Sequence, residues 1–430
     1  MTDFAASYGS LPPALAPPRI ASLQRALLWL VGCSGAVVFV EPSPYELTTL
    51  LAMIVLVATG LSLRLAFLPL IAMLFLVNIG YSISAANLMN QSRIVTWIMT
   101  SWYMAITAIF FAMAVAQDTA ARLDFLRRGL IAGALIASLA GIAGYFSLFP
   151  GAHSLFTLYG RAMGPFKDPN VFSAFLILPA LFLLQSVVSD RFGKALRSTL
   201  LLGVVALALL LAFSRAAWGQ FIVTSAFMLF MMVLTSRTNV QRSRIVILTA
   251  VAVAMGVALL LVLLSFDSID TVFKQRASFE QSYDEGRFGR FGRHILGARM
   301  ALDLPFGIGP LQFTKFFPED THNSYLNAFM SGGWISGVCY PALIVTTVIL
   351  GFRYAFVRSP WQRVYLAVFA TFLGTVGEAF IIDTDHWRHF WMMLGLMWGM
   401  FAANQHYLGT ARRSWGAAKA AMGWPSTARV

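Results

Sequence analysis

Long, uninterrupted apolar runs dominate the chain, and short polar or charged stretches separate them. A helix needs about 20 apolar residues to cross the hydrocarbon core of a bilayer. The runs do not alternate between apolar and polar residues, as the strands of an outer-membrane barrel do. The sequence therefore predicts about twelve membrane-spanning helices. They are Ala26–Val40, Tyr45–Leu63, Leu65–Ser84, Ile94–Ala116, Gly129–Phe149, Val171–Val188, Ser198–Phe213, Ala216–Thr235, Ile245–Phe266, Tyr325–Phe352, Val364–Ile382 and Trp387–Asn404.

The composition agrees with a protein that lies mainly inside a membrane. Hydrophobic residues occupy 58% of the 430 positions and charged residues only 11%, against about 25% charged residues in a soluble protein. Such a chain lacks the polar surface that a water-soluble domain requires, which excludes a soluble enzyme. We predict an all-α polytopic membrane protein with one large periplasmic loop. Its segments are a cytoplasmic tail (1–25), nine spans (26–266), the loop (267–324), three spans (325–404) and a second cytoplasmic tail (405–430).

The net charge of +13 is explained by the orientation of the helices. Basic residues gather in the short cytoplasmic loops of membrane proteins. If the N-terminus is cytoplasmic and the spans alternate, most of the 31 lysines and arginines fall on the cytoplasmic side. The short outer loops then hold only Arg93, Arg161, Lys167, Arg215 and Arg388. The pattern predicts that both termini are cytoplasmic, and the positive charge does not require a nucleic-acid partner.

The segment Asp267–Ser324 is the longest outside the predicted spans and is where we look first for chemistry. Arg287, Arg290 and Arg293 recur at every third residue, so a helix there would carry them on roughly one face. Such a stripe either faces solvent and lipid headgroups or grips phosphate, because guanidinium groups bind phosphate oxygens bidentately. His322 follows at the start of the tenth span. Its imidazole suits a proton acceptor at neutral pH, although a lone histidine at a membrane surface is more often just an interfacial polar residue.

A second polar cluster follows the eleventh span. It contains Glu378, Asp383, Asp385, His386, Arg388 and His389. The simplest interpretation is a hydrated loop, and the alternative is a divalent-metal site. Glu378 lies about one turn inside the outer boundary, so we expect it to face a water-filled cavity. The sequence shows no P-loop, dinucleotide fingerprint or zinc-binding motif, which points to a reaction that uses a pre-activated, lipid-linked substrate and no cofactor.

Three stretches resemble the O-antigen ligases and the related lipid-linked polysaccharide polymerases. The first is Arg161-Ala162-Met163-Gly164-Pro165-Phe166-Lys167-Asp168-Pro169-Asn170, and the second is Phe213-Ser214-Arg215-Ala216-Ala217. The third runs from Arg290 through Pro305-Phe306-Gly307-Ile308-Gly309-Pro310 to His322-Asn323 and Gly333. The chain departs from the family pattern at Ser331 and Ser336, where an acidic residue and a glycine are common. The resemblance spans roughly residues 160–340.

This resemblance implies a metal-independent, inverting glycosyltransferase of the membrane-embedded, GT-C-like type. The donor would be a glycan on undecaprenyl diphosphate, and the acceptor would be lipid A-core or another glycan. His322 would activate the acceptor hydroxyl, and Arg161, Arg215 and Arg290 would hold the diphosphate. Supporting positions are Asn170, Asn323, Arg287, Arg293 and Glu378. The active site would face the periplasm from the bacterial inner membrane.

Two further functions remain open on the sequence. A polysaccharide polymerase of the same superfamily differs only in its acceptor, and the single large basic outer loop favours the ligase. A secondary transporter or flippase would also have twelve helices. The sequence places few ionisable groups near helix midplanes, where coupling sites usually lie, and this argues against transport.

Overall fold

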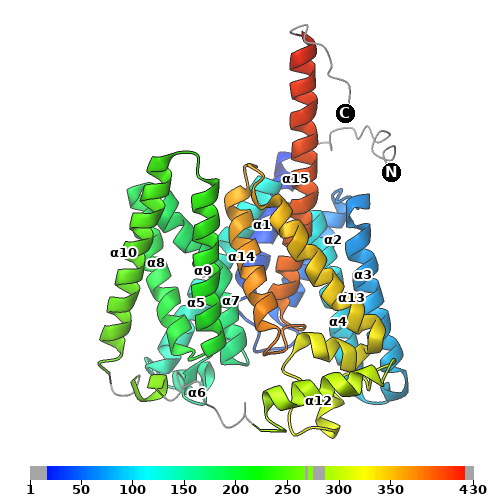
Figure 1. Cartoon of the computed structure of the whole chain (residues 1–430). Helices are drawn as coiled ribbons and strands as arrows, with labels where there is room; N and C mark the ends of the chain where they lie inside the picture. The colour runs from blue at the N-terminus through cyan, green and yellow to red at the C-terminus, as the bar shows by residue number, and fades with distance from the viewer. Residues whose placement is uncertain (1–16, 267–269, 275–285, 422–430) are drawn as a thin grey trace.

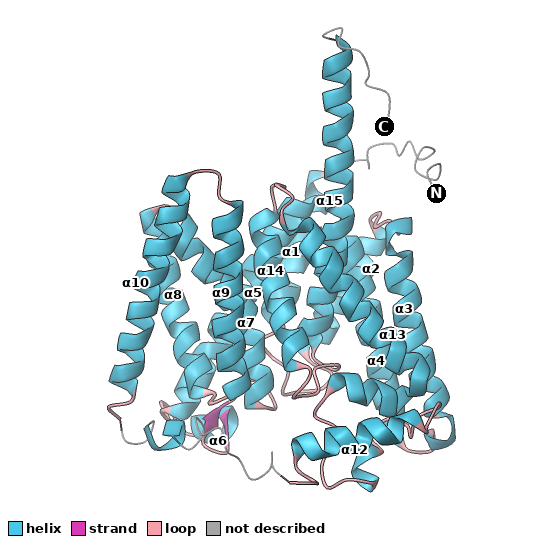
Figure 2. Cartoon of the chain, viewed as in Figure 1, coloured by secondary structure: helices cyan, strands magenta, loops and turns pink. Residues whose placement is uncertain are grey.

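The computed structural model describes residues 17–266, 270–274 and 286–421, and these residues are almost entirely α-helical (Figure 2). Within these ranges, one small antiparallel hairpin pairs β1 with β2, and three short 3-10 helices, η1 to η3, lie in the connections. The elements are α1 (Pro18–Ser34), α2 (Pro44–Ala58), η1 (Leu65–Phe67), α3 (Leu68–Ser84), η2 (Ala86–Leu88), α4 (Ser92–Val115), α5 (Thr119–Tyr145), α6 (Ala152–Phe156), β1 (Thr157–Leu158), β2 (Arg161–Ala162), α7 (Pro169–Ser189), α8 (Phe192–Leu211), α9 (Arg215–Thr235), α10 (Asn239–Leu263), α12 (Arg290–Leu302), η3 (Phe313–Lys315), α13 (Ser324–Ala355), α14 (Gln362–Glu378) and α15 (Arg388–Ala421).

Every predicted span overlaps one α-helix of the structure. Among the described residues, eight helical segments are long and apolar enough to cross a bilayer. They are Leu65–Ser84, Ser92–Val115, Thr119–Tyr145, Pro169–Ser189, Phe192–Leu211, Arg215–Thr235, Asn239–Leu263 and Ser324–Ala355. The all-α polytopic membrane fold is therefore confirmed, whereas the full number of twelve spans stays a prediction.

The helix boundaries differ from the prediction at both ends of the chain. Helix α1 begins at Pro18 rather than at Ala26 and ends at Ser34 rather than at Val40. Beyond it, the backbone N–H of Val38 donates to Pro165 O (3.0 Å), so this stretch packs on the loop between β2 and α7. Helix α15 continues past Asn404 to Ala421 and projects from the bundle (Figure 1). Alanine strongly favours a helix, and this extension contains several alanines, so the helix continues beyond the end of the apolar run.

Burial distinguishes a central helix from a peripheral one. In the most apolar window of α7, 89% of the residues are buried, whereas in α10 only 6% are buried. Figure 1 accordingly shows α10 at the edge of the bundle. An apolar helix with this much exposed surface has the character expected of a lipid-facing helix.

The connections gather at two ends of the bundle. At one end, Arg25 of α1 forms an ion pair with Asp118 (2.5 Å), which lies between α4 and α5. At the opposite end lie α6, the β1–β2 hairpin and α12 (Figure 1). The second end also holds an ion pair between Lys167 and Glu41 (2.5 Å) and a contact of Arg388 with Glu46. The functional candidates belong to this second end.

Candidate active site

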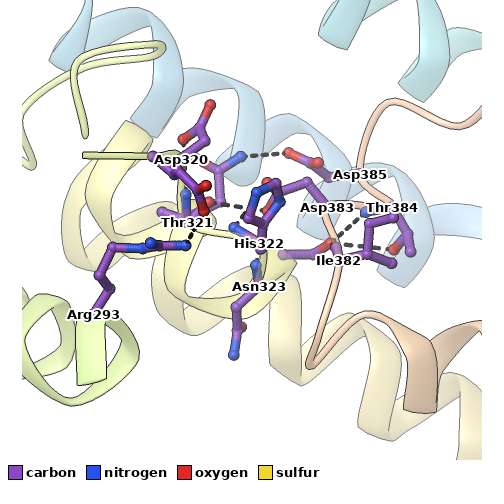
Figure 3. A network of polar contacts seen from close by, with 12 residues as sticks. Arg293, Asp320, Thr321, His322, Asn323, Ile382, Asp383, Thr384 and Asp385 are labelled. Atoms are coloured by element: carbon purple, nitrogen blue, oxygen red, sulfur yellow. Dashed lines mark hydrogen bonds and ion pairs between the residues drawn. The ribbon is translucent and has the colours of Figure 1, made fainter. Parts of the chain in front are cut away.

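His322 lies in the connection just before α13 and has a left-handed backbone conformation, with φ of 46°. The carboxylate of Asp383 accepts hydrogen bonds from the backbone N–H groups of His322 (3.0 Å) and Asn323 (2.9 Å) and from the hydroxyl of Thr321 (2.9 Å) (Figure 3). A non-glycine residue in the left-handed region is strained, and it keeps this conformation only where contacts with its surroundings hold it there. Asp383 provides these contacts and so fixes the backbone position from which the imidazole side chain of His322 extends.

The residues after His322 join the start of α13 to the α14–α15 loop, residues 379–387. The side-chain oxygen of Asn323 accepts from the N–H groups of Tyr325 (3.1 Å) and Leu326 (3.0 Å), which caps the helix. Its amide nitrogen donates to Phe380 O (3.1 Å). The hydroxyl of Ser324 accepts from the N–H of Thr384 (2.7 Å). Asn323 therefore has a structural role: it caps α13 and ties the start of this helix to the α14–α15 loop.

The imidazole of His322 is partly open to solvent and lies in a positive environment. Its side chain is 38% exposed, and its Nδ1 is 3.9 Å from Asp383 Oδ2, too far for a hydrogen bond. Burial and then the charge of Arg290 lower the pKa of His322, against smaller opposing effects of Asp320 and Glu319. A lowered pKa keeps the imidazole neutral at pH 7, the form that accepts a proton.

Helix α12 packs beside the histidine and contributes several side chains. Arg290, whose charge acts on His322, is its first residue. His294 lies one turn later, with its Nε2 2.9 Å from Thr321 O. Burial lowers the pKa of His294, opposed by its hydrogen bond to Thr321. The helix thus contacts the backbone that leads into His322.

The predicted arginine stripe is wrong as a single helical face. Helix α12 begins at Arg290 because Gly286 is left-handed (φ 80°) and Gly289 is extended at the N-cap, so Arg287 precedes the helix. Arg287 is exposed. Arg293 is buried, with one guanidinium nitrogen donating to Glu319 (2.7 Å) and another to Phe288 O (2.9 Å). The three arginines therefore have different environments. Arg290 has the larger electrostatic effect on His322, and Arg293 adds a smaller one.

The glycine-rich turn of the third motif packs against a break in α13. Gly333 has φ of 63° inside the helix, and a Cβ there would lie 2.2 Å from Pro305 O. The break lets the N–H of Trp334 donate to Pro305 O (2.9 Å) and the N–H of Ile308 donate to Met330 O (2.7 Å). The motif glycines thus hold the loop after α12 against α13.

Arg161 and Asn170 lie on the other side of this end, beside the start of α9. The guanidinium of Arg161 donates to Ala212 O (2.8 Å) and to Asn170 Oδ1 (2.8 Å). Ala212 belongs to the α8–α9 turn, and Arg215 is the first residue of α9. Arg161 is buried, so it also has a structural role in joining the hairpin to this turn.

Glu378 links α9 to the loop that holds His322. It is buried at the end of α14. With the Gln220 amide oriented to satisfy both of its atoms, the nitrogen donates to Glu378 Oε2 (2.9 Å) and the oxygen accepts from the Thr375 hydroxyl (2.9 Å). One and a half turns of helix separate Gln220 from Arg215, which places the arginine end of α9 near the α14–α15 loop.

The second polar cluster of the sequence does not converge on one point. Asp383 binds residues 321–323, Asp385 accepts from Asn327 Nδ2 (2.8 Å), and His386 packs on Trp97. Arg388 contacts Glu46. Within the described part of the chain, no three His, Cys, Asp or Glu side chains are placed to hold a metal together.

Asp383 and His294 have roles that the sequence did not reveal. Asp383 was one of several polar residues in an ordinary-looking loop, and its partner lies 61 positions earlier. Burial and the nearby carboxylate of Asp385 raise its pKa, while the hydrogen bonds from Thr321 and Asn323 oppose the rise. His294 directly follows Arg293, and nothing in the local sequence indicates its contact with Thr321, 27 positions later.

The fold and these contacts define a multi-pass membrane protein whose candidate functional residues lie at one end of a helical bundle. Residues 200–340 match the family model described as O-Antigen ligase, so this part of the chain carries that family's domain. The superfamily predicted from the sequence is confirmed. The match contains Arg215, Arg290 and His322 but neither Arg161 nor Asn170. No curated protein matches the chain.

Proposed function

We propose that the protein is a membrane-embedded glycosyltransferase that moves a glycan from undecaprenyl diphosphate to an acceptor hydroxyl, and that it acts as an O-antigen ligase on lipid A-core. The observation that carries the proposal is the arrangement of His322. Its backbone is clamped by Asp383, its imidazole is accessible, and Arg290 adds positive charge beside it. All three features suit a neutral base next to an anionic leaving group.

The proposed reaction is a single displacement. Neutral His322 accepts the proton of the acceptor hydroxyl, and the oxygen attacks the anomeric carbon of the donor sugar. The bond between that carbon and the diphosphate oxygen breaks, and undecaprenyl diphosphate leaves with the electron pair. Arg215, Arg290 and Arg161 stabilise the charge that develops on it, since guanidinium groups act strongly in a partly dry site. Attack opposite the leaving group inverts the anomeric centre, and no metal or cofactor takes part.

The proposed location is the bacterial inner membrane, with both termini in the cytoplasm and the site facing the periplasm. The distribution of basic residues supports this orientation. Cysteine-labelling of single-cysteine variants in α12 and in the α14–α15 loop tests it. An impermeant reagent added outside should modify these positions in intact inner-membrane spheroplasts. Modification only after permeabilisation would reverse the orientation.

Reconstitution of the purified protein tests the activity. Proteoliposomes would receive an undecaprenyl-diphosphate-linked glycan and lipid A-core, with a chelator present and no ion gradient. We expect the glycan to appear on lipid A-core. Extension of one lipid-linked glycan by another would assign a polymerase instead. Movement of the donor across the bilayer without transfer would contradict both enzymatic functions.

A further inference from the structure

An open groove of about 350 Å³ borders the α14–α15 loop, which also carries Asp383, the residue that holds the His322 backbone. It is lined by Ser92, Arg93, Thr96, Trp97, Thr100, Leu311 and His386. These residues come from α4, from the turn before η3 and from the α14–α15 loop. Sites that bind small ligands have volumes of about 300–1,000 Å³. The groove is therefore large enough for one or two sugar units.

The α4 wall of the groove is polar although it belongs to a predicted span. Ser92, Thr96 and Thr100 recur at every fourth residue and form one row of hydroxyls along about 12 Å of helix. The hydroxyl of Thr96 donates to Ser92 O (3.0 Å) and that of Thr100 donates to Thr96 O (2.8 Å). Because the hydroxyl protons of Thr96 and Thr100 are already used, their oxygens present lone pairs that can accept from a ligand's hydroxyl groups.

Trp97 and Arg93 form a second row beside the hydroxyls. The ring of Trp97 packs on His386, with 4.4 Å between ring centroids, and meets Tyr81 edge-on. These contacts fix the indole in place. A rigid aromatic surface next to hydroxyl acceptors suits a sugar ring, which has an apolar C–H face and a polar rim. Exposed Arg93 at the same wall favours a saccharide that carries negative charge.

The groove shares its loop with the residues that hold His322. His386 Nδ1 lies 3.4 Å from Asp385 Oδ2, and Asp385 in turn accepts from Asn327 of α13. Asp383, two residues before Asp385, accepts a hydrogen bond from the backbone N–H of His322. Figure 1 shows α3 and α4 on one side of the bundle and α8, α9 and α10 on the other. The groove and the Arg161–Arg215 region therefore lie on opposite sides of the α14–α15 loop.

We propose that this groove binds the saccharide headgroup of the acceptor glycolipid and directs its hydroxyl towards His322. The inference rests on the proposed function and adds the acceptor subsite to it. An inverting displacement needs the acceptor and the leaving group on opposite faces of the transferred sugar. The arginine-rich side suits the diphosphate, and the groove, with its hydroxyls, indole and Arg93, suits a sugar that carries some negative charge.

Direct binding tests the groove without requiring turnover. Purified protein in nanodiscs would be titrated with lipid A-core, with the free core oligosaccharide, and with lipid A that lacks the core. The test variants are the double substitution Thr96→Val and Thr100→Val, which keeps side-chain shape, and Trp97→Leu. Thr199→Val on α8 is the matched control, because Thr199 makes the same bond to the carbonyl four residues earlier.

We expect the double valine variant to weaken binding of lipid A-core and of the free core oligosaccharide by about tenfold, which corresponds to about 1.4 kcal/mol. Binding of core-free lipid A should not change, and Thr199→Val should behave as wild type. In the transfer assay the KM for the acceptor should rise while the KM for the donor stays constant. Equal saccharide binding by wild type and the double variant would overturn the proposal, as would a rise in the donor KM alone.

The two proposals fail separately. If no variant, including wild type, transfers glycan, but the double variant still loses saccharide binding, the groove stands and the glycosyltransferase function fails. If transfer occurs normally in the double variant and saccharide binding is unchanged, the function stands and the groove assignment fails. Loss of core-free lipid A binding in the variants would identify a lipid site rather than a saccharide site.

Discussion

Asp383 hydrogen-bonds to the backbone of His322 but not to its imidazole. Its Oδ2 accepts from the His322 N–H at 3.0 Å, whereas Nδ1 of the imidazole stays 3.9 Å away. In many hydrolases a carboxylate contacts the imidazole itself and stabilises its charged form. Here the carboxylate instead fixes a left-handed backbone, so the imidazole is positioned without being tied to an acid.

Replacement of Asp383 should therefore reduce transfer by disturbing position. Asp383→Ala removes the acceptor of three hydrogen bonds, and each bond to a charged group is worth about 1.5–3 kcal/mol. We expect kcat to fall at least about tenfold and the melting temperature to drop. Thr321→Val removes one of the three bonds and should have a smaller effect on both. Wild-type kcat in Asp383→Ala would show that the clamp is not needed.

Substitutions of His322 can distinguish the proposed role of its imidazole as a base from the role of its left-handed backbone. Asparagine tolerates a left-handed conformation better than alanine does, so His322→Asn should fold like wild type yet lack the proton acceptor. His322→Ala should also abolish transfer and lose up to about 1–2 kcal/mol of stability through backbone strain. Activity and thermal unfolding would be measured together. Near-normal turnover in His322→Asn would refute the assigned role of the imidazole.

The pH profile should report the charge environment of His322. Transfer needs the neutral imidazole, so activity falls as the pH drops through its pKa, which burial and Arg290 hold below the ordinary value of about 6.5. Arg290→Gln removes a positive charge, favours the imidazolium, raises the pKa and moves the acidic limb to higher pH. Lys315→Gln, which removes the charge at the last residue of η3, serves as the control. An unchanged acidic limb in Arg290→Gln would contradict the coupling.

The two arginines on the α9 side should respond differently to lysine. Arg215→Lys should lower kcat/KM by tenfold or more, because a single ammonium group loses the bidentate contact with phosphate. Arg161→Lys should lower kcat/KM and, unlike Arg215→Lys, should also lower the melting temperature, since it breaks the bonds to Ala212 O and Asn170. Kinetics and thermal unfolding of both variants test the distinction. An unimpaired Arg215→Lys enzyme would make that arginine structural.

The sequence predicted the helices well because a bilayer imposes a strong and local requirement on each span. Every predicted span has a helix, and the motif order placed Arg290 and His322 together in one segment between predicted spans. The groove and the Asp383 clamp could not be predicted, since both depend on contacts between residues far apart in the chain. Arg293 shows the limit of spacing: its charge suited phosphate, but tertiary packing turned it towards Glu319.

The break in α13 provides a last prediction, about how the histidine segment is held. Gly333→Ala places a Cβ 2.2 Å from Pro305 O at a position with φ of 63°, so the backbone must shift. We expect loss of several °C in melting temperature and a fall in kcat, because the 305–310 turn would no longer fit against α13. Gly377→Ala in α14 is the matched control. A Cβ there meets nothing within 4 Å, and alanine favours a helix over glycine by about 1 kcal/mol. Equal stability of Gly333→Ala and Gly377→Ala would show that the glycine break does not hold the loop that carries His322.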